Sequence, residues 1–460
     1  PPRSTLFPYT TLFRSSLALI GSLPLFFYFG VTRGADGFGS WLLAFTDAYF
    51  EIMSGFTTTG ATILSNIEAV PRSLLFLRSL THWLGGMGII TLAIVIFPAM
   101  GISAYSMYRG EVPGPTHDKL RPRLAQTAQV LWGVYVSLTA AETVLLIVAG
   151  MGWFDAVNHA FATMATGGFS TKNASVAAFD SAWIEWILIV FMFLAGVNFL
   201  LHFKTFRGDF TGVVQDREFR FYTYVIVVAI VIAASVLALQ GAAPIEVAAH
   251  EYRYSERSAE VFAEHYAREE AKVRSIGDCI RAAAFQVVSI TTTTGFVTAD
   301  YDIWPDFLRF LLVLLMFFGG CAGSTGGGIK MIRMLVAAKA SVIQLRKLTQ
   351  PRLVAPVKGG GDPIDGEKIT NILAFLVLFA GLFAGVGALL TLFVPDLTTA
   401  FTASIATLGN VGPGLAGVGA IENYGWIPMP GKWLLVLSML LGRLEVFTVL
   451  IVLRPAIWRR

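Results

Sequence analysis

Long apolar stretches alternate with short polar segments along this chain of 460 residues. A helix that crosses a bilayer needs about 20 mainly apolar residues. Stretches of about this length predict eight transmembrane spans, of which one is interrupted by glycines. The predicted spans are 16–31, 79–100, 129–151, 183–203, 221–240, 305–340 (interrupted), 371–394 and 430–453. The pattern therefore predicts an all-α polytopic membrane protein.

Between the two spans of each successive pair lies a shorter segment that ends in a string rich in threonine or glycine. The four strings read TTTGAT (57–62), ATGGFST (165–171), TTTTGFVT (291–298) and ATLGNVG (406–412). In three copies an aspartate precedes a glycine by 13 residues, in the pairs Asp47 and Gly60, Asp155 and Gly168, and Asp396 and Gly409. In the third copy, which ends at Gly295, this offset holds Ala282. The shared register indicates an internal repeat.

About ten residues of helix followed by a non-helical string are too short to cross ~30 Å of hydrocarbon. Each segment is therefore expected to enter and leave the membrane on one side, as a re-entrant pore loop between two helices. Four such units, pseudo-symmetric around one central pore, are the predicted fold. Their expected bounds are 16–100, 101–203 with a cytosolic connector, 204–340 with an outer charged insertion at 242–277, and 341–460 with a basic cytosolic connector.

The composition agrees with a membrane protein and excludes other classes. Hydrophobic residues make up 55% of the chain and charged residues 14%, whereas soluble proteins have nearer ~25% charged residues. The net charge of +4 is small and the basic residues are scattered among loops, so we expect membrane lipid and no nucleic acid as a partner. Lysine and arginine gather in the connectors between repeats, which places the connectors in the cytoplasm and the strings outside.

The cysteines and the first 15 residues each give one further expectation. Cys279 and Cys321 are too few and too far apart to suggest a disulfide framework or a metal cluster. Residues 1–15, PPRSTLFPYTTLFRS, have no basic region followed by an apolar region and a cleavage site, so they do not predict a signal peptide. This string resembles translated sequencing-adapter read-through. We expect it to be a non-native leader, with the natural chain beginning near Ser16 and missing an upstream part.

The strings have the chemistry of an ion filter. Non-helical backbone at membrane depth is tolerated only inside protein or along a water-filled cavity, and carbonyls that face a cavity can replace the hydration shell of an alkali cation. Glycine allows the dihedrals that turn successive carbonyls one way, and threonine adds a hydroxyl. The short preceding helices would direct their partial negative ends at a cation. The alternative, tight helix packing around small residues, explains one string better than four in register.

The predicted filter residues are the members of the four strings that lie at or next to the aligned glycines. They are Thr58, Thr59, Gly60, Thr166, Gly167, Gly168, Thr293, Thr294, Gly295, Thr407, Leu408, Gly409 and Asn410.

The sixth span breaks at GGCAGSTGGG, residues 319–328. Six glycines in ten residues cannot maintain a straight helix, because each costs roughly 1 kcal/mol relative to alanine. A flexible polar loop inside a helix and beside a cavity is therefore expected. A phosphate-binding loop is disfavoured because Lys330 is followed by Met331 where that motif needs serine or threonine, and no soluble strand precedes the glycines.

A family resemblance completes this interpretation. The motifs TTTGAT, THWLGGMGI, ATGGFST, TTTTGFVT, GGCAGSTGGGIK, LGNVGPG and LGRLEVFT, in this order, resemble those of the TrkH-type subunits of bacterial potassium uptake systems, within the Trk/Ktr/HKT superfamily. The resemblance covers the chain from about residue 16 onward. It implies a potassium transporter of the bacterial inner membrane, not an enzyme, with no cofactor apart from the K⁺ that it carries. Family members commonly carry additional helices before the first repeat.

The same resemblance implies a gate and partners. An intramembrane loop under the filter would block the pore, and an arginine in the last span would face the pore below the filter. These gate residues are Gly319, Gly320, Gly323, Ser324, Thr325, Gly326, Gly327, Gly328 and Arg443. The resemblance also implies a homodimer and a cytosolic TrkA-type ring that binds nucleotides. In related plant transporters a serine at the first filter glycine accompanies sodium selectivity, so Gly60 favours potassium here.

Several other polar residues have a structural and a functional interpretation. Arg443 could instead form an ion pair with Glu445, and Glu142 in the third span invites the same two interpretations. His82 and Trp83 precede small residues and His159 lies in a pore segment, so packing is expected for all three. Residues 246–274 are predicted to form a solvated amphipathic helix on the outer face. A metal site there would use His250, His265, Glu251 and Glu269.

Two rival functional classes remain open from the residues alone. An ion-coupled secondary transporter, a symporter with broken helices, predicts inverted repeats and acidic side chains at the membrane midplane. A sodium-permeable member of the same superfamily is the nearer alternative. A membrane enzyme would need a catalytic constellation at membrane depth, for which the spacing gives no support.

Overall fold

The structure, a computed structural model, describes residues 7–88, 124–240, 266–270, 272–273, 275–350, 356–357 and 364–443. Within these ranges the regular structure is helical, apart from one bridged pair, Phe318 and Ile329. The expectation of an all-α protein is confirmed. Most of the predicted outer insertion 246–274, with His250, Glu251 and His265, and the C-terminal part of the last span, with Glu445, lie outside the described residues.

Four long helices begin the four repeats. They are α1 (Phe7–Thr32), α6 (Leu124–Val148), α11 (Arg217–Gln240) and α17 (Gly366–Leu390). Within the described residues these are the four single helices long and apolar enough to cross a membrane. Each overlaps one of the predicted spans. In lipid, a run of 19 to 25 apolar residues can satisfy its backbone hydrogen bonds within the segment only as a helix. Helix α1 begins at Phe7, inside the string 1–15 expected to be a leader.

A pore helix follows each long helix and ends at one of the four strings. These helices are α2 (Phe38–Phe56), α7 (Trp153–Met164), α14 (Ile276–Thr291) and α18 (Leu397–Leu408). Their side chains are buried toward the strings, and polar caps fix two of their starts. The Ser275 hydroxyl accepts the Asp278 N–H at 3.1 Å, and the Asp396 carboxylate accepts the Thr399 N–H at 2.7 Å. Helices α2 and α14, with 19 and 16 residues, are longer than the ten or so residues expected.

The second helix of each repeat is shorter or broken. In order, these are α3 (Arg72–Trp83) with the π-helical turn Leu84–Gly88, α8 (Ala182–Ala195) with α9 (Phe199–Phe206), α15 (Asp306–Met316) with α16 (Met331–Thr349), and α19 (Met429–Arg443). Short helices α10 (Phe210–Val214), Ser175–Phe179, Tyr301–Ile303 and Ala416–Val418 lie in the connections.

The predicted span 183–203 is not one straight helix. Helices α8 and α9 meet at an angle of 104°. Helix α8 ends at Ala195 with Gly196 as its C-cap, and Asn198 caps the new helix by accepting the Leu200 N–H at 2.9 Å. The next repeat stabilises this break, because the Gly196 carbonyl accepts the Cys321 N–H of the glycine-rich loop at 2.8 Å. The sequence analysis missed this break because Leu, Phe and Val surround it.

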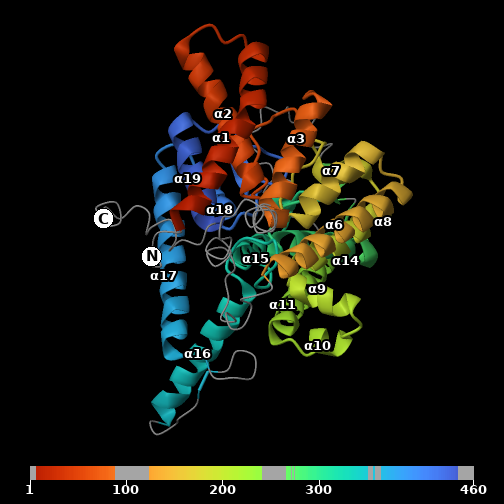
Figure 1. Ribbon diagram of the computed structural model, residues 1–460, viewed down its shortest axis with the longest axis vertical. Coiled ribbons are helices and arrows are strands. Elements are labelled where there is room, and N and C mark those ends of the chain that lie inside the picture. Colours follow the sequence, from red (N-terminus) through yellow and green to blue (C-terminus); the bar gives the residue numbers. More distant parts are fainter. Residues whose placement is uncertain are drawn as a thin grey trace.

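The repeats pack in two halves (Figure 1). One apolar cluster joins helices of the second and third repeats around α8, α11, α14 and α15, and extends to residues of α17, α18 and α19. Another joins the first and fourth repeats around α1, α2, α18 and α19. A buried ion pair crosses this second junction. The Asp47 carboxylate accepts from Lys432 Nζ at 2.7 Å and from Arg33 Nη1 at 2.6 Å.

Replacement of Lys432 by alanine is expected to destabilise the junction of the first and fourth repeats. The side chains of Lys432 and Asp47 are 6% and 8% exposed, and loss of one partner from a buried pair costs about 3–5 kcal/mol. The partly exposed Arg33 offsets part of this cost, so an apparent melting temperature several degrees lower is expected for the purified protein in detergent. As a matched control, Asp306→Asn breaks a pair whose aspartate is 86% exposed, and it should leave the melting temperature almost unchanged. Equal melting temperatures for all three proteins would contradict the assignment.

Candidate ion pathway

The four strings share one backbone conformation directly after their pore helices. Each string contains a left-handed residue shortly after the pore helix ends, with φ of 50° at Thr58, 53° at Thr166, 61° at Thr293 and 55° at Asn410. Two residues later a glycine has φ of 82° (Gly60), 79° (Gly168), 80° (Gly295) and 103° (Gly412). Non-glycine residues adopt positive φ only at a cost that the surroundings must offset. A strained conformation that recurs four times at one place in the repeat is a shared structural feature, not an accident of one loop.

The four glycines interlock in a closed ring. A Cβ atom added to any of them would overlap the carbonyl oxygen of the residue just before the glycine of the next repeat. The pairs are Gly60 with Gly167, Gly168 with Thr294, Gly295 with Val411, and Gly412 with Thr59. Because the fourth repeat returns to the first, the strings surround one axis. Glycine is required at these places by positive φ and by the close approach of a neighbouring carbonyl.

The ring corrects the alignment of the fourth string. The spacing from Asp396 paired Gly409 with Gly60, but the backbone places Gly412 there. Gly409 corresponds to Thr57, since the Gly409 N–H donates to Ile405 O at 2.7 Å as Thr57 N–H donates to Met53 O at 2.9 Å. Asn410 belongs to the ring as predicted, whereas Thr407 and Leu408 lie in the last turn of α18.

Side-chain hydrogen bonds stabilise individual strings and join the fourth string to the first. Oγ1 of Thr57 and Oγ1 of Thr59 are 2.8 Å apart, and Thr292 and Thr294 repeat this contact at the same distance. Asn410 Nδ2 donates to Thr59 Oγ1 at 2.9 Å and joins the fourth repeat to the first. All four pore helices end at the ring, so their partial negative ends converge on it and favour a cation.

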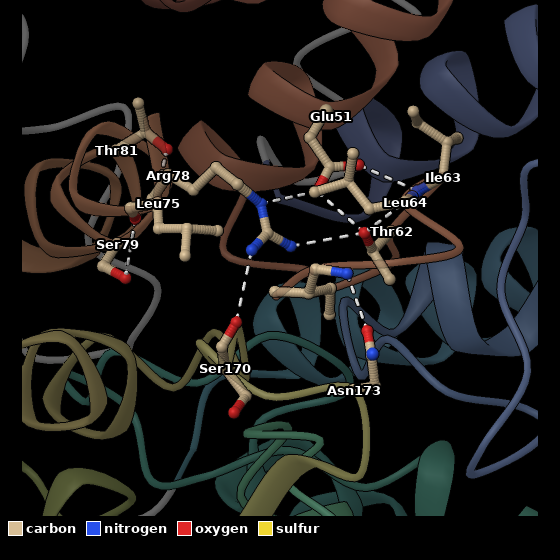
Figure 2. Close-up of polar contacts among 11 residues, drawn as sticks. Glu51, Thr62, Ile63, Leu64, Leu75, Arg78, Ser79, Thr81, Ser170 and Asn173 are labelled. Carbon is tan, nitrogen blue, oxygen red and sulfur yellow. Dashed lines mark hydrogen bonds and ion pairs between the residues drawn. The ribbon is translucent and has the colours of Figure 1, made fainter. Parts of the chain in front are cut away.

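In three of the four repeats, a polar side chain at one pore-helix position anchors the chain that leaves the string. In the first repeat Glu51 holds this place, fully buried. Its carboxylate accepts from Thr62 Oγ1 and from the Ile63 N–H, both at 2.8 Å, and from Arg78 Nε at 2.7 Å. In Figure 2 the Arg78 guanidinium lies between Glu51, Thr62 and Ser170 of the second repeat, whose carbonyl it reaches at 3.2 Å.

The second and third repeats place other side chains at the same position. His159 Nε2 lies 3.0 Å from Ser170 Oγ, and its Nδ1 lies 2.7 Å from Asp155 O. Gln286, with its amide oxygen turned to the string, accepts the Thr298 N–H at 2.9 Å. The fourth repeat has Ala403 there, and the neighbouring Thr402 Oγ1 accepts the Leu415 N–H at 3.0 Å instead. These anchors could not be recognised from the sequence, because Glu51, His159 and Gln286 are different residue types with one role and the fourth repeat uses a neighbouring residue.

The glycine-rich segment of the sixth span folds into a compact loop, here called the gate loop (residues 318–330). Its two ends pair with each other, as the Gly319 N–H donates to Ile329 O at 2.7 Å and the Ile329 N–H donates to Phe317 O at 3.1 Å. Glycine is needed at Gly319, where a Cβ atom would overlap the Gly327 carbonyl, and at Gly323, where φ is 78°. The predicted break in the helix is therefore present, and it separates α15 from α16.

The gate loop contacts the ring and the neighbouring repeats. The Gly327 N–H donates to Thr293 Oγ1 at 2.7 Å, and Thr325 Oγ1 donates to Met164 O at 3.0 Å. Arg443, at the end of α19, donates to Thr325 O at 2.7 Å and to Gly85 O at 3.3 Å. Lys330 Nζ donates to Gly326 O at 2.8 Å within the loop. Contacts to the third string, to the end of the second pore helix and to the last described helix of the fourth repeat place the loop beside the common axis.

Other predicted polar residues have packing roles or lie apart from the ring. His82 is buried with its ring stacked on Phe169, the ring centroids 4.0 Å apart, and Trp83 Nε1 donates to Thr139 Oγ1 at 3.2 Å. Glu142 is fully buried in α6. Glu269 pairs with Lys272 at 2.6 Å and accepts the Asp300 N–H at 2.8 Å. These contacts attach this part of the insertion to the chain that follows the third string. In the described part of the chain, no group of three or more His, Cys, Asp or Glu residues could hold a metal ion.

Comparisons with known proteins agree on one family. The family model described as "TrkH: Cation transport protein" matches residues 31–460. The "Trk system potassium uptake protein TrkH" of Halomonas elongata is 39% identical, with 99% of this chain and 86% of that protein covered. The protein of the same name from Escherichia coli K12 is also 39% identical, with 98% and 86% covered. Among solved structures, the "Potassium Transporter TrkH from Vibrio parahaemolyticus" superposes with a TM-score of 0.79 at 36% identity, over 100% of this chain and 86% of that one.

Substitution of Glu51 by leucine is expected to destabilise the protein strongly. Arg78 is 1% exposed, and it would keep its charge in a buried place without the carboxylate, at a cost of about 3–5 kcal/mol. The double variant Glu51→Leu/Arg78→Met removes both charges and should regain part of this stability. Thermal unfolding in detergent measures both changes. A double variant that is less stable than either single variant would refute the view that the unpaired charge dominates the cost.

Proposed function

The chain belongs to the TrkH family of cation transport proteins, and we propose that it takes up potassium through a pore that runs along the axis of its ring of glycines. It is a multi-pass transporter of the inner membrane and not an enzyme. Relatives that are 39% identical are named potassium uptake proteins, which favours potassium as the ion here. The transported K⁺ is then a substrate and no resident cofactor is involved.

One observation carries this proposal: the closed ring of glycine and carbonyl contacts between the four repeats. An ion that enters the membrane loses hydration, and a rigid set of carbonyl oxygens around one axis can replace the lost water. The proposed filter consists of four three-residue segments. They are Thr58–Gly60, Thr166–Gly168, Thr293–Gly295 and Asn410–Gly412.

The amides of the strings support this assignment. The Thr59 N–H donates to Ser54 O at 2.9 Å, and the equivalent amides of Gly167, Thr294 and Val411 each return to their own pore helix at 2.8 Å. Inward-facing amides would repel a cation. With these donors turned back into the protein, the amides do not oppose a cation on the axis. The Gly412 carbonyl accepts from the Tyr424 hydroxyl at 2.7 Å, so the oxygens proposed for the ion are mainly those of the residues before the glycines.

The gate loop is proposed to block the pathway on the cytosolic side of the filter. It has hydrogen bonds to the second string region through Met164 and to the third through Thr293. Arg443 adds a positive charge next to the loop, which opposes the passage of a cation, and also holds the loop through Thr325 O. Opening then requires the loop to leave these partners.

Regulation is proposed to come from the cytosolic side. Lys204 and Arg207 on α9, with Arg217 and Arg220 at the start of α11, give this face exposed positive charge. A cytosolic nucleotide-binding ring of the TrkA type and a homodimer in the membrane are the partners that the family resemblance implies. The rival symporter with inverted repeats is less favoured, since four units that run in the same direction form the ring.

Gly295→Ser is expected to impair selective conduction. Serine at φ of 80° is strained, and its Cβ would overlap Val411 O and approach Pro413 Cδ at 2.9 Å, so the ring must distort. A distortion of about 1.4 kcal/mol that affects one ion more than another changes selectivity about tenfold. Rubidium and sodium uptake into proteoliposomes measures the ratio.

The matched control is Gly381→Ser in α17, where an added Cβ would meet nothing within 4 Å. Its ratio of rubidium to sodium uptake should equal that of the unmodified protein. Equal rubidium and sodium uptake by the unmodified protein, or an unaltered ratio in Gly295→Ser, would reject the proposed filter.

Arg443→Gln is expected to raise the rubidium flux several-fold in the absence of any partner. The substitution removes a positive charge beside the pathway and weakens a charge-assisted hydrogen bond to Thr325 O, which is worth about 1.5–3 kcal/mol. Lys347→Gln in α16 removes an exposed cytosolic charge of the same sign and serves as the control. A flux through Arg443→Gln that is no greater than that of the control would exclude Arg443 from the gate.

A further inference from the structure

A single carboxylate connects both ends of the gate loop to a cytosolic segment. Glu218 lies in the first turn of α11 and is half-buried. Its Oε1 accepts the Ala322 N–H at 2.7 Å and the Ile332 N–H at 3.0 Å. Ala322 is in the first half of the loop, and Ile332 lies just after the loop in the first turn of α16. One oxygen atom therefore holds the first half of the loop and the first turn of α16.

The chain before Glu218 makes a second contact with the same loop. The segment 199–216, here called the cytosolic hairpin, contains α9 and α10 and lies between the break in the second repeat and α11 (Figure 1). At its start, the Phe199 N–H donates to Gly323 O at 3.1 Å. Just past its end, Glu218 accepts from Ala322 and Ile332. The hairpin is thus fastened to neighbouring residues of the gate loop at both of its ends.

The two contacts differ in strength. The contact at Phe199 is a single hydrogen bond between peptide groups, whereas Glu218 accepts two hydrogen bonds, from the N–H groups of Ala322 and Ile332. The contact at Glu218 is therefore the stronger of the two attachments of the hairpin to the loop.

We propose that Glu218 is a positioning residue that latches the gate loop to the cytosolic hairpin, so that displacement of the hairpin releases the loop. This proposal rests on the assignment of the loop as the gate. It differs from a purely structural role for Glu218, which would stabilise the fold without control of the loop. The substitutions Glu218→Ala and Glu218→Gln separate the two roles, because glutamine retains an acceptor oxygen of the same shape without the charge.

The native cysteines supply a direct reporter of the loop. Cys321 is next to Ala322 and 1% exposed, and Cys279 is the other cysteine of the chain. In a Cys279→Ser background, Cys321 is the single thiol. Its rate of modification by a small membrane-permeant maleimide in proteoliposomes measures how often the loop leaves its closed position. This rate is independent of any ion flux.

Glu218→Ala is expected to raise the rate of Cys321 modification about tenfold, since the hydrogen bonds from Ala322 and Ile332 are both lost, and Glu218→Gln should give a smaller increase. Rubidium flux should rise in the same order, with the ratio of rubidium to sodium unchanged. The matched control is Asp216→Asn. It removes a negative charge two residues away, while asparagine can still accept the Phe219 N–H that Asp216 accepts at 2.8 Å. Both readouts should then equal those of the parent.

The outcomes separate the latch from the function on which it rests. An unchanged modification rate in Glu218→Ala overturns the latch. The latch is also overturned if Glu218→Ala and Asp216→Asn raise the rate equally, because loss of local charge would then suffice. Faster modification without a rise in flux supports the latch and overturns the assignment of the loop as the gate. A parent protein that conducts rubidium and sodium equally rejects the filter, and leaves the modification rates as a valid test of Glu218.

Discussion

The peptide groups of the four strings constrain the rest of the fold, because backbone at membrane depth must find its partners inside the protein. The strings meet this constraint in one way four times. The amide of the residue before each glycine returns to the pore helix, as from Thr59 to Ser54 O. The contacts between Gly60 and Gly167 and their three equivalents then fix the distance between neighbouring strings. No string can move alone, so the ring sets where the pore helices, and through them the outer helices, must lie.

The four repeats reach the same ring with different side chains, and the differences follow from their surroundings. The first repeat anchors its outer chain with the buried pair of Glu51 and Arg78, which also reaches the second repeat through Ser170 O. Neutral anchors suffice where the outer chain can be held by a histidine or an amide, as at His159 and Gln286. The charged version satisfies three donors at once, but it makes the first repeat sensitive to loss of either partner. The four strings therefore share one backbone conformation, while the side chains that anchor them differ.

The elements that follow from composition could be predicted from the sequence, whereas those that depend on contacts between distant residues could not. The four long spans and the existence of four re-entrant strings follow from apolar runs and from the Thr/Gly strings, since lipid leaves few alternatives. The pairing of Gly409 with Gly60 failed because Asp396 only caps α18, so its distance from the string is free to vary. The break after Gly196 was invisible because its partner, Cys321, is more than a hundred residues away. The interlocked carbonyls likewise have no signature in a single string.

On the proposal that the loop is a gate, its closed position is held by an amount of free energy that binding of another molecule can supply. The contacts through Thr325 and Gly327 and the two that Glu218 accepts are each worth about 0.5–1.5 kcal/mol net as ordinary hydrogen bonds, and the contact of Arg443 involves charge at about 1.5–3 kcal/mol. To shift a two-state equilibrium from 1:99 to 99:1 takes about 5.5 kcal/mol of differential binding. The two quantities are comparable. On the same proposal, a loop held much more tightly could not be opened by a partner on the cytosolic hairpin, and one held only through Thr325 and Gly327 would leak. The contacts of Arg443 and Glu218 would bring the total into the range where conduction can be regulated.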